Sequence, residues 1–511
     1  MKTIFIFFAT TMALLACSIA HGEDEKPTSP KLATNITHHS LETLSGNLSY
    51  RAETGMLGLK NISGLPDASF FYIYYSCSGN ASTPASAISG NGGSRPIIFS
   101  FNGGPGSSSV WMHLGFLGPQ RVVIGDSGLA LPPPASLEPN PHSALAQADL
   151  VFIDPITTGF SRTEDSKKAG DFHDFHADIK SVSEFIRLFL TKKQKWACPK
   201  LVIGESYGTI RAVGVANYLQ KEHGIGLNGV ILVSSVLNFQ ALHPAPGSDL
   251  TYLMFLPSLS ATAWYHQALA PEQQKLELSD LLKQTEKFCA TEYGQKLFAG
   301  SALEKTEKDA LNHKLSALTG LSPELIATCE QRISMSLFSK KLLEKKGLML
   351  GRMDSRVLGY TLDPLSPSMD YAPCLSSLLT VCSGAMNLYL QKDLATFSDE
   401  PYEILTGKVH PWRWGAENQY LNVCDRLSST MVQNPSMKVF VVSGHYDLAT
   451  PYFATEYNLR HLELPHALRK NILSKNYPAG HMPFLDKTVL VNLSADLKNF
   501  ILQSCRTDGA E

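Results

Sequence analysis

The stretch Leu201-Val202-Ile203-Gly204-Glu205-Ser206-Tyr207-Gly208 decides the predicted fold. Its first three residues form an apolar run typical of a buried strand, and residues 210–220 continue with a helical pattern. A G-x-S-x-G pentapeptide between a strand and a helix is the context of a nucleophile elbow, where glycines clear space for a strained turn that exposes the serine hydroxyl. Without that context, a serine in an ordinary turn is an equal alternative. The context makes Ser206 the candidate nucleophile of an enzyme.

Similar short apolar runs recur along the chain, and each ends at turn residues. They occupy residues 96–101, 149–153, 201–203, 229–233 and 438–442. Continuous apolar strands separated by helices indicate an α/β fold with a mostly parallel central sheet that is covered by helices on both faces. This rhythm stops between residues 237 and 435, where helical segments rich in Gln, Glu, Lys and Leu prevail.

Three parts are therefore predicted for the folded chain. Residues 41–236 and 436–505 form the two parts of the core, and residues 237–435 form an inserted, largely helical cap. Apolar side chains at helical spacing in residues 486–504 predict a closing amphipathic helix.

A serine hydroxyl needs a base to become nucleophilic, and the base needs an orienting carboxylate. Asp447 follows the last apolar run, and His481 lies in a glycine-containing loop before the closing helix. The order Ser206, Asp447, His481 is the order of catalytic residues that accompanies a nucleophile elbow. His445 is a rival base, but it precedes Asp447 and is interpreted as a loop residue that lines or flanks the site.

Acyl transfer also requires hydrogen-bond donors for the developing oxyanion. The backbone N–H of Tyr207, directly after the nucleophile, is one candidate. The second candidate is Gly104, in the loop Asn102-Gly103-Gly104-Pro105-Gly106-Ser107 after an earlier strand. A phosphate-binding interpretation of this loop is disfavoured because it lacks the Walker spacing and its lysine.

With these motifs in place, the sequence resembles the serine carboxypeptidase family of α/β-hydrolases, as a bacterial-type exported member, from about residue 46 to the end. The resemblance rests on the loop at 102–106, the segment 154–161, the elbow and Gly480-His481-Met482. It implies removal of single residues from peptide C-termini through an acyl-enzyme, usually at acid pH and without metal or cofactor. It also implies that Asn102, Gly103 and Glu205 bind the substrate, the first and last of them at its terminal carboxylate.

The chain departs from the family pattern at three positions. Ser107 stands where the family loop usually has cysteine, and Thr157 replaces a family glycine. Phe116 stands where relatives often carry a second carboxylate-binding Glu. The last departure makes terminal-carboxylate recognition depend on Glu205, which must be protonated to donate a hydrogen bond. It leaves an esterase or an acyltransferase with the same three catalytic residues as alternatives. A non-catalytic scaffold would require the loss of one of them.

Composition excludes some partners and favours export. The 511 residues carry 44 Lys+Arg and 46 Asp+Glu, so a net charge of −2 gives no electrostatic reason to expect nucleic acid or an anionic membrane as partner. Lys2 and the apolar run 4–16 predict a signal peptide over residues 1–22 and a periplasmic or secreted protein. Alternatively, Leu14-Leu15-Ala16-Cys17 resembles a lipoprotein box, with Cys17 acylated and membrane-anchored. No later apolar run reaches the length of about 18 residues that spans a bilayer.

Eight cysteines remain outside the leader, and an even number in an exported chain favours disulfides, with at least one expected to pin the cap. Their connectivity stays open, and so does the oligomeric state. No C-x-x-C spacing indicates a zinc site. His173 and His176 form an H-x-x-H pattern that resembles a metal site, but a helix start is the preferred interpretation. Trp412 and Trp414 are expected to line a substrate subsite or to pack between cap and core.

Overall fold

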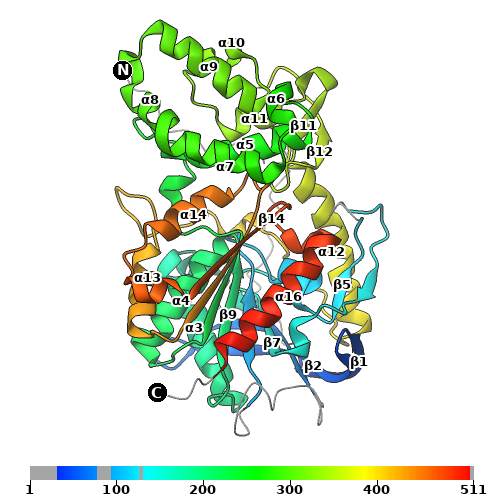
Figure 1. Cartoon of the computed structure of the whole chain (residues 1–511). Coiled ribbons are helices and arrows are strands. Elements are labelled where there is room, and N and C mark those ends of the chain that lie inside the picture. The colour runs from blue at the N-terminus through cyan, green and yellow to red at the C-terminus, as the bar shows by residue number, and fades with distance from the viewer. Residues whose placement is uncertain (1–31, 78–93, 126–129, 367, 507–511) are drawn as a thin grey trace.

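The computed structural model describes residues 32–77, 94–125, 130–366 and 368–506. The expected signal peptide and Cys17 lie outside these described residues. A ten-stranded sheet forms the centre of the protein (Figure 1). Its strands run in the order β1-β2-β3-β7-β4-β9-β10-β13-β14, and β8 pairs with β3 at the side.

The sheet begins with antiparallel strands and continues as a parallel sheet. The antiparallel part consists of β1 (Asn35–Thr43), β2 (Gly46–Lys60), β3 (Pro66–Cys77) and the short β8 (Arg162–Thr163). The parallel part consists of β7 (Asp149–Ile153), β4 (Ile97–Phe101), β9 (Lys200–Glu205), β10 (Gly229–Val233), β13 (Lys438–Gly444) and β14 (Ile472–Tyr477). Every residue of β4, β7 and β10 is buried, as expected for strands covered on both faces. The predicted mostly parallel sheet is confirmed.

Helices cover both faces of this sheet. One face carries α3 (Phe175–Lys192), α4 (Tyr207–His223) and α13 (Cys424–Gln433). The other face carries α12 (Pro373–Lys392) and α16 (Lys487–Ser504), which is the expected closing helix. Among the described residues, α12 alone is long and apolar enough to span a bilayer by length and composition. Half of its apolar window is buried, and it packs into the core cluster.

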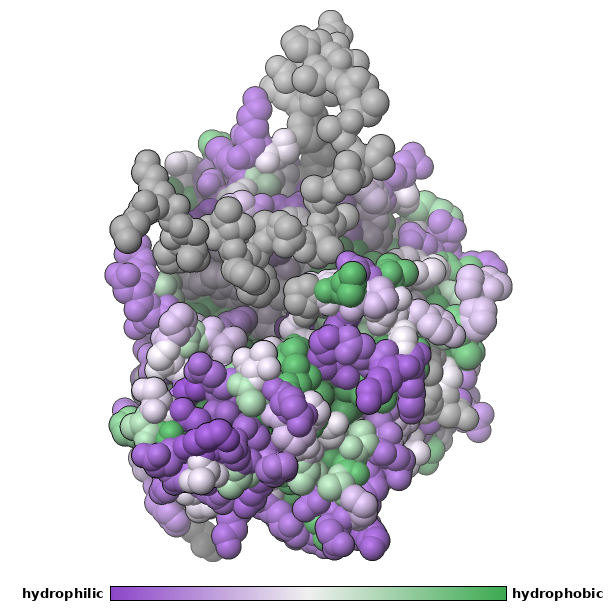
Figure 2. All heavy atoms as spheres, turned by 90° about the horizontal axis from the view of Figure 1, so that it is seen from above, coloured by the Kyte–Doolittle hydropathy of each residue, from purple (hydrophilic) through white to green (hydrophobic). Residues whose placement is uncertain are grey.

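A second group of helices lies above the central sheet in the view of Figure 1 and forms its own hydrophobic cluster, to which Tyr446 and Leu448, in the loop after β13, also belong. Its elements are α5 (Leu250–Tyr265), α6 (Pro271–Gln274), α7 (Leu278–Phe288), α8 (Gly294–Ala299), α9 (Lys305–Thr319), α10 (Pro323–Thr328) and α11 (Met335–Lys341), followed by the hairpin β11 (Leu348–Leu350) and β12 (Leu358–Tyr360). We call these helices and the hairpin the cap. Seen from above, the surface is mainly hydrophilic, with hydrophobic residues in separate patches (Figure 2).

The structure differs from the expectation of disulfides. All eight cysteines of the described residues are free thiols: Cys77, Cys198, Cys289, Cys329, Cys374, Cys382, Cys424 and Cys505. Cys374 and Cys382 share α12, and eight residues of helix separate them by about 12 Å. A disulfide needs Cα atoms only about 4–7 Å apart. Burial raises the pKa of the Cys382 thiol to about 12, so this thiol stays protonated and unreactive.

The H-x-x-H segment is a helix start, as preferred. The Asp174 side chain accepts hydrogen bonds from the backbone N–H groups of His176 and Ala177, at 2.9 and 3.2 Å, and caps α3. A carboxylate at a helix N-terminus satisfies free donors and interacts favourably with the helix dipole. In the part of the chain that the structure describes, no three His, Cys, Asp or Glu side chains are grouped as a metal site would require.

A buried ion pair joins the two helices behind the elbow. Arg211 of α4 donates from Nε to the Asp178 carboxylate of α3 at 2.8 Å, and both side chains are almost fully buried. Arg211 Nη1 also donates to the Asn102 carbonyl, and the Tyr207 hydroxyl donates to Asp178 at 3.1 Å. The pair therefore ties α3 and α4 to the loop that follows β4.

Replacing Asp178 with Asn should lower the free energy of unfolding by about 3–5 kcal/mol, because it leaves the Arg211 charge buried without its partner. Urea unfolding followed by tryptophan fluorescence measures this change. The control is Asp280→Asn, because Asp280 and Lys283 form an exposed pair whose loss should cost less than about 1 kcal/mol. Equal losses in the two variants would contradict the role given to the buried pair.

Candidate active site

The elbow places Ser206 between β9 and α4, where the strand turns sharply into the helix. Ser206 has φ of +59° and ψ of −129°, a backbone conformation that L-residues rarely adopt. Its backbone N–H donates to the Val233 carbonyl of β10 at 3.0 Å, which holds the turn against the neighbouring strand. The Ser206 side chain keeps partial contact with solvent, although the residues on both sides of it are buried.

Glycines allow the loop after β4 to contact this turn backbone to backbone. A Cβ atom on Gly103 would lie 2.5 Å from the Tyr207 nitrogen, and one on Gly204 would lie 2.0 Å from the Gly208 oxygen. Among the described residues, the backbone N–H groups of Gly104 and Tyr207 have no hydrogen-bond acceptor. Two unpaired donors next to the serine are what an oxyanion hole requires.

The structure brings Asp447 and His481 together from two loops. His481 Nδ1 lies 2.8 Å from Asp447 Oδ2, and both side chains are buried. The other carboxylate oxygen, Oδ1, accepts from the backbone N–H groups of Ala449 and Thr450, at 2.7 and 2.9 Å. The Thr450 hydroxyl also donates to Oδ2 at 2.7 Å. These bonds fix the carboxylate so that it can orient the imidazole ring.

The other ring nitrogen of His481 contacts Glu205. His481 Nε2 lies 3.1 Å from Glu205 Oε1, and Asn102 Nδ2 donates to Glu205 Oε2 at 2.8 Å. Burial by itself lowers the pKa of His481, but the carboxylates of Asp447 and Glu205 outweigh it and raise this pKa to about 10. This arrangement favours the doubly protonated imidazolium, whose Nε2 contacts Glu205, and among the described residues Nε2 has no hydrogen bond to the Ser206 hydroxyl.

His445, the rival base, lies apart from this arrangement. Its ring packs edge-on against Tyr452, with centroids 4.9 Å apart, and burial lowers its pKa to about 4. Among the described residues, no acceptor or donor contacts its Nδ1. His445 therefore packs beside the site without contacting Asp447.

A segment between the cap strands crosses both catalytic loops, and sequence reasoning missed it. We call residues 352–355 the crossing segment. The Arg352 carbonyl accepts from the N–H of Leu448 at 3.0 Å, the Met353 carbonyl accepts from the N–H of His481 at 2.6 Å, and Ser355 donates to the Tyr446 carbonyl at 3.0 Å. The crossing segment thus fixes the spacing of the acid and base loops. Its hydrogen bonds to the two loops are main-chain bonds, and their signal in the sequence is Gly480, where a Cβ atom would lie 2.5 Å from Asp354 Cβ and 2.6 Å from the Met353 oxygen.

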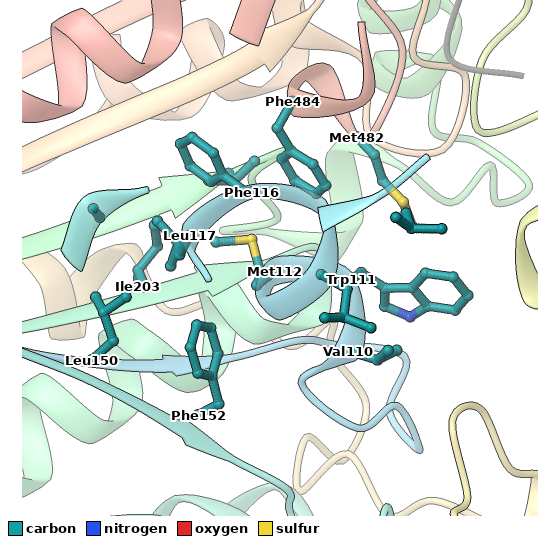
Figure 3. Close-up of a cluster of buried hydrophobic side chains, with 14 of the residues drawn as sticks. Val110, Trp111, Met112, Phe116, Leu117, Leu150, Phe152, Ile203, Met482 and Phe484 are labelled. Carbon is teal, nitrogen blue, oxygen red and sulfur yellow. The ribbon is translucent and has the colours of Figure 1, made fainter. Parts of the chain in front are cut away.

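The structure shows the surroundings of the three departures from the family pattern, and it explains those at Phe116 and Ser107 but not the one at Thr157. Phe116 is buried and stacks on Phe484, with centroids 5.3 Å apart and planes at 4°, inside the apolar cluster of Figure 3. The Ser107 hydroxyl accepts from Trp111 Nε1 at 2.8 Å, and Thr157 adopts φ of +77°, a conformation that glycine favours. The position of a second acid is therefore apolar in this protein.

The two tryptophans lie against the elbow. Trp412 and Trp414 both contact the Tyr207 ring edge-on, with centroids 5.5 and 5.8 Å apart. Trp414 keeps 38% of its surface exposed. It therefore packs against the elbow and also presents an apolar face to solvent.

Part of the chain is similar in sequence to curated carboxypeptidases. Carboxypeptidase Y of Schizosaccharomyces pombe is 37% identical over 116 residues, which are 22% of this chain and 10% of that protein. Serine carboxypeptidase-like 33 of Arabidopsis thaliana is 28% identical over 123 residues, which are 24% of each chain. The chain thus matches less than a quarter of the length of either curated relative.

A solved structure supports the fold over nearly the whole chain. Kex1(Δ)p, a prohormone-processing carboxypeptidase from Saccharomyces cerevisiae, superimposes with a TM-score of 0.55 at 15% identity, covering 93% of this chain and 96% of that one. The α/β-hydrolase fold is confirmed. The family model described as serine carboxypeptidase matches residues 44–482. Because this match covers most of the chain, the protein belongs to the serine carboxypeptidase family.

Proposed function

We propose that the protein is a serine-type carboxypeptidase in which Ser206 is the nucleophile, His481 the general base and Asp447 its orienting acid. The observation that carries the proposal is the 2.8 Å contact of His481 Nδ1 with Asp447 Oδ2. His481 also contacts Glu205, the residue directly before Ser206, and the elbow holds Ser206 at φ of +59°. Gly104 and Tyr207 supply the oxyanion donors. Asn102, Gly103 and Glu205 form the substrate-binding side, and peptide or protein C-termini are the substrates.

The proposed reaction proceeds through an acyl-enzyme on Ser206. Ser206 Oγ bonds to the carbonyl carbon of the last peptide bond while His481 Nε2 takes the hydroxyl proton. The negative charge on the carbonyl oxygen faces the N–H groups of Gly104 and Tyr207. His481 then passes the proton to the leaving amine, and the C–N bond breaks. Water attacks the acyl-enzyme by the same proton path and releases the shortened peptide.

The contact between Glu205 and His481 explains how an anionic substrate could be accepted. An incoming carboxylate repels an ionised Glu205, and this repulsion favours transfer of the proton from His481 Nε2 to Glu205 Oε1, 3.1 Å away. The transfer leaves a neutral imidazole that can act as base. It also leaves a protonated Glu205 that can donate to the substrate carboxylate, beside the amide of Asn102. A single proton shared by the pair then serves binding and catalysis.

Ser206→Ala should lose fluorophosphonate labelling completely and about four to six orders of magnitude in kcat, because removal of one of three cooperating groups disables all of them. Labelling followed by mass spectrometry, and peptide hydrolysis assays, measure the two effects. Ser377→Ala, on α12, is the matched control and should behave as wild type. A folded Ser206→Ala protein that still labels would overturn the assignment of the nucleophile.

The pH dependence should differ between free-acid peptides and their C-terminal amides. Free-acid peptides need the proton shared by His481 and Glu205, so their kcat/KM should fall as rising pH removes it. Amides need only neutral His481, which the raised pKa of this imidazole disfavours at low pH, so their kcat/KM should rise with pH. The ratio of the two values, measured from pH 4 to pH 10, should therefore fall. The expected acid optimum stays a prediction that the same profiles test.

Glu205→Gln should remove this divergence. Loss of the Glu205 charge removes one of the two carboxylates that raise the pKa of His481, so the rising limb for amides should move to lower pH. The exposed Glu272 of α6 offers the control variant Glu272→Gln, which should keep both wild-type profiles. Coinciding free-acid and amide profiles in wild type would show that Glu205 does not read a carboxylate.

One observation favours the alternative substrates. Phe116 makes the position of the second acid apolar, which would suit an acyl acceptor or an ester without a terminal carboxylate. A panel of matched peptides, peptide esters and acyl donors with alcohol acceptors separates the possibilities. Release of free C-terminal amino acids supports the carboxypeptidase, whereas turnover of esters alone supports the esterase or acyltransferase.

We also propose that the protein is exported, to the periplasm or the medium, or anchored as a lipoprotein through Cys17. The apolar run 4–16 and the small residues before Glu23 support this placement. Mass spectrometry of the N-terminus of the protein from its native cells distinguishes cleavage before Glu23 from acylation of Cys17.

A further inference from the structure

Among the predicted residues of the proposed carboxypeptidase site, only His481 can carry a positive charge, and it is already in contact with the Asp447 and Glu205 carboxylates. Glu205 Oε2 accepts from Asn102, Glu205 Oε1 lies 3.1 Å from His481 Nε2, and Phe116 contributes only an apolar face. A peptide carboxylate entering such a site would lose its hydration and meet two buried carboxylates. Desolvation of an unpaired charge is costly, so a cation near the site would be expected. The inference below rests on the proposed function.

The crossing segment brings an arginine to this place. The backbone carbonyl of Arg352 accepts from the N–H of Leu448, the residue directly after the catalytic acid Asp447, at 3.0 Å. The next residue, Met353, is bonded in the same way to His481. Arg352 therefore starts from the point where the cap meets both catalytic loops.

Its side chain is available for a ligand. Within the described chain, the Arg352 guanidinium has neither a hydrogen bond nor an ion pair, and the residue is exposed. Arg356, four residues further on, is bound to Asp354 and Asp486 and is not available. Arg211, behind the elbow, is occupied by Asp178. Arg352 is thus the unoccupied cation among these three arginines of the region.

The Arg352 guanidinium interacts electrostatically with Asp447 and with His243. Surrounding protein atoms lower the pKa of Arg352, while the carboxylate of Asp447 raises it. Burial lowers the pKa of His243, and the Arg352 charge lowers it further. The guanidinium therefore lies within Coulombic range of both side chains, although it keeps contact with solvent.

A row of aromatic rings runs from Tyr207 to His243. Tyr207 contacts Trp414 at 5.8 Å between centroids, Trp414 contacts Phe239 at 4.8 Å, and Phe239 stacks on His243 at 5.2 Å. The row begins at the elbow and ends at His243, whose pKa the Arg352 charge lowers. Such a wall offers apolar surface to a peptide whose carboxylate would be held by the cation at its end.

We infer that Arg352 is a specificity-determining residue that binds a carboxylate of the peptide substrate. A guanidinium donates two parallel N–H groups to a carboxylate in a fork that matches its geometry. The carboxylate could be the chain terminus or an acidic side chain of the last two residues, and the experiment separates these sources. Arg352 supplies the attraction that Phe116 does not, and it acts from the cap.

Peptide binding to the folded Ser206→Ala protein tests this without requiring turnover. Calorimetry compares four forms of one peptide: free acid or C-terminal amide, each with a neutral or an acidic residue at the last two positions. Adding Arg352→Gln to Ser206→Ala should weaken binding of the recognised carboxylate about 10-fold or more, because charge-assisted hydrogen bonds are lost. Arg352→Lys should retain part of the affinity, and Lys498→Gln, an exposed charge of α16, should change nothing.

The pattern across the four peptides decides the source. A loss confined to free acids identifies the chain terminus, and a loss confined to acidic side chains identifies a preference for acidic residues. Equal affinities in the Arg352→Gln and Lys498→Gln proteins for all four peptides would overturn the inference. A wild-type protein that binds these peptides through Arg352 but cleaves none of them would overturn the proposed carboxypeptidase activity and leave the role of Arg352 intact.

In active protein, the same substitution should separate binding from chemistry. Arg352→Gln should raise KM for the recognised peptides about 10-fold while kcat changes less, because the guanidinium contacts the substrate away from the breaking bond. Fluorophosphonate labelling of Ser206 should proceed at the wild-type rate. A fall in labelling equal to the fall in kcat/KM would mean that the substitution disturbs the catalytic loops, and would refute a role confined to the carboxylate.

Discussion

The hydrogen bond between His481 and Asp447 is the interaction on which the rest of the site depends. It joins the loop after β13 to the loop after β14, and both loops follow the elbow by more than 200 residues of chain. Parallel strands end at the same edge of a sheet, so the fold brings Ser206, Asp447 and His481 to one edge although the cap separates them in sequence. The Thr450 hydroxyl and two backbone N–H groups then fix the carboxylate.

A steric constraint accounts for the other side of the site. The backbone after β4 lies so close to the elbow that a Cβ atom at Gly103 would overlap the main chain at Tyr207 and Gly208. This close approach is what places the unpaired N–H groups of Gly104 and Tyr207 together. The buried pair of Arg211 and Asp178 supports it from behind, because Arg211 also donates to the Asn102 carbonyl. The glycine-rich loop after β4 and the glycine-containing elbow thus pack against each other, backbone to backbone.

Sequence patterns were sufficient for the parts of the protein that local chemistry dictates. The runs 149–153 and 229–233 are β7 and β10, residue for residue, because fully buried strands read as unbroken apolar stretches. The elbow glycines are a second local signal, and the order of Ser206, Asp447 and His481 along the chain can be read directly from the sequence. The contact of His481 Nε2 with Glu205 and the main-chain bonds of residues 352–355 depend on distant segments meeting in space. Disulfides were expected from an even count of cysteines, and a count carries no geometry.

The protonation state of His481 depends on where the substrate anion binds, and the cap contributes to that binding. The carboxylates of Asp447 and Glu205 raise the pKa of His481, and an imidazolium must lose a proton before it can act as base toward a serine. The arrival of an anionic substrate can shift the proton toward Glu205, but only if the anion is held close to it. Favourable contacts with a distant part of the substrate can then lower the free-energy barrier at the reacting centre. Residues 352–355 fix the Asp447 and His481 loops through their main chain and carry Arg352 on the same segment. Substrate recognition by the cap and the protonation state of the catalytic base are thereby coupled through one short stretch of chain.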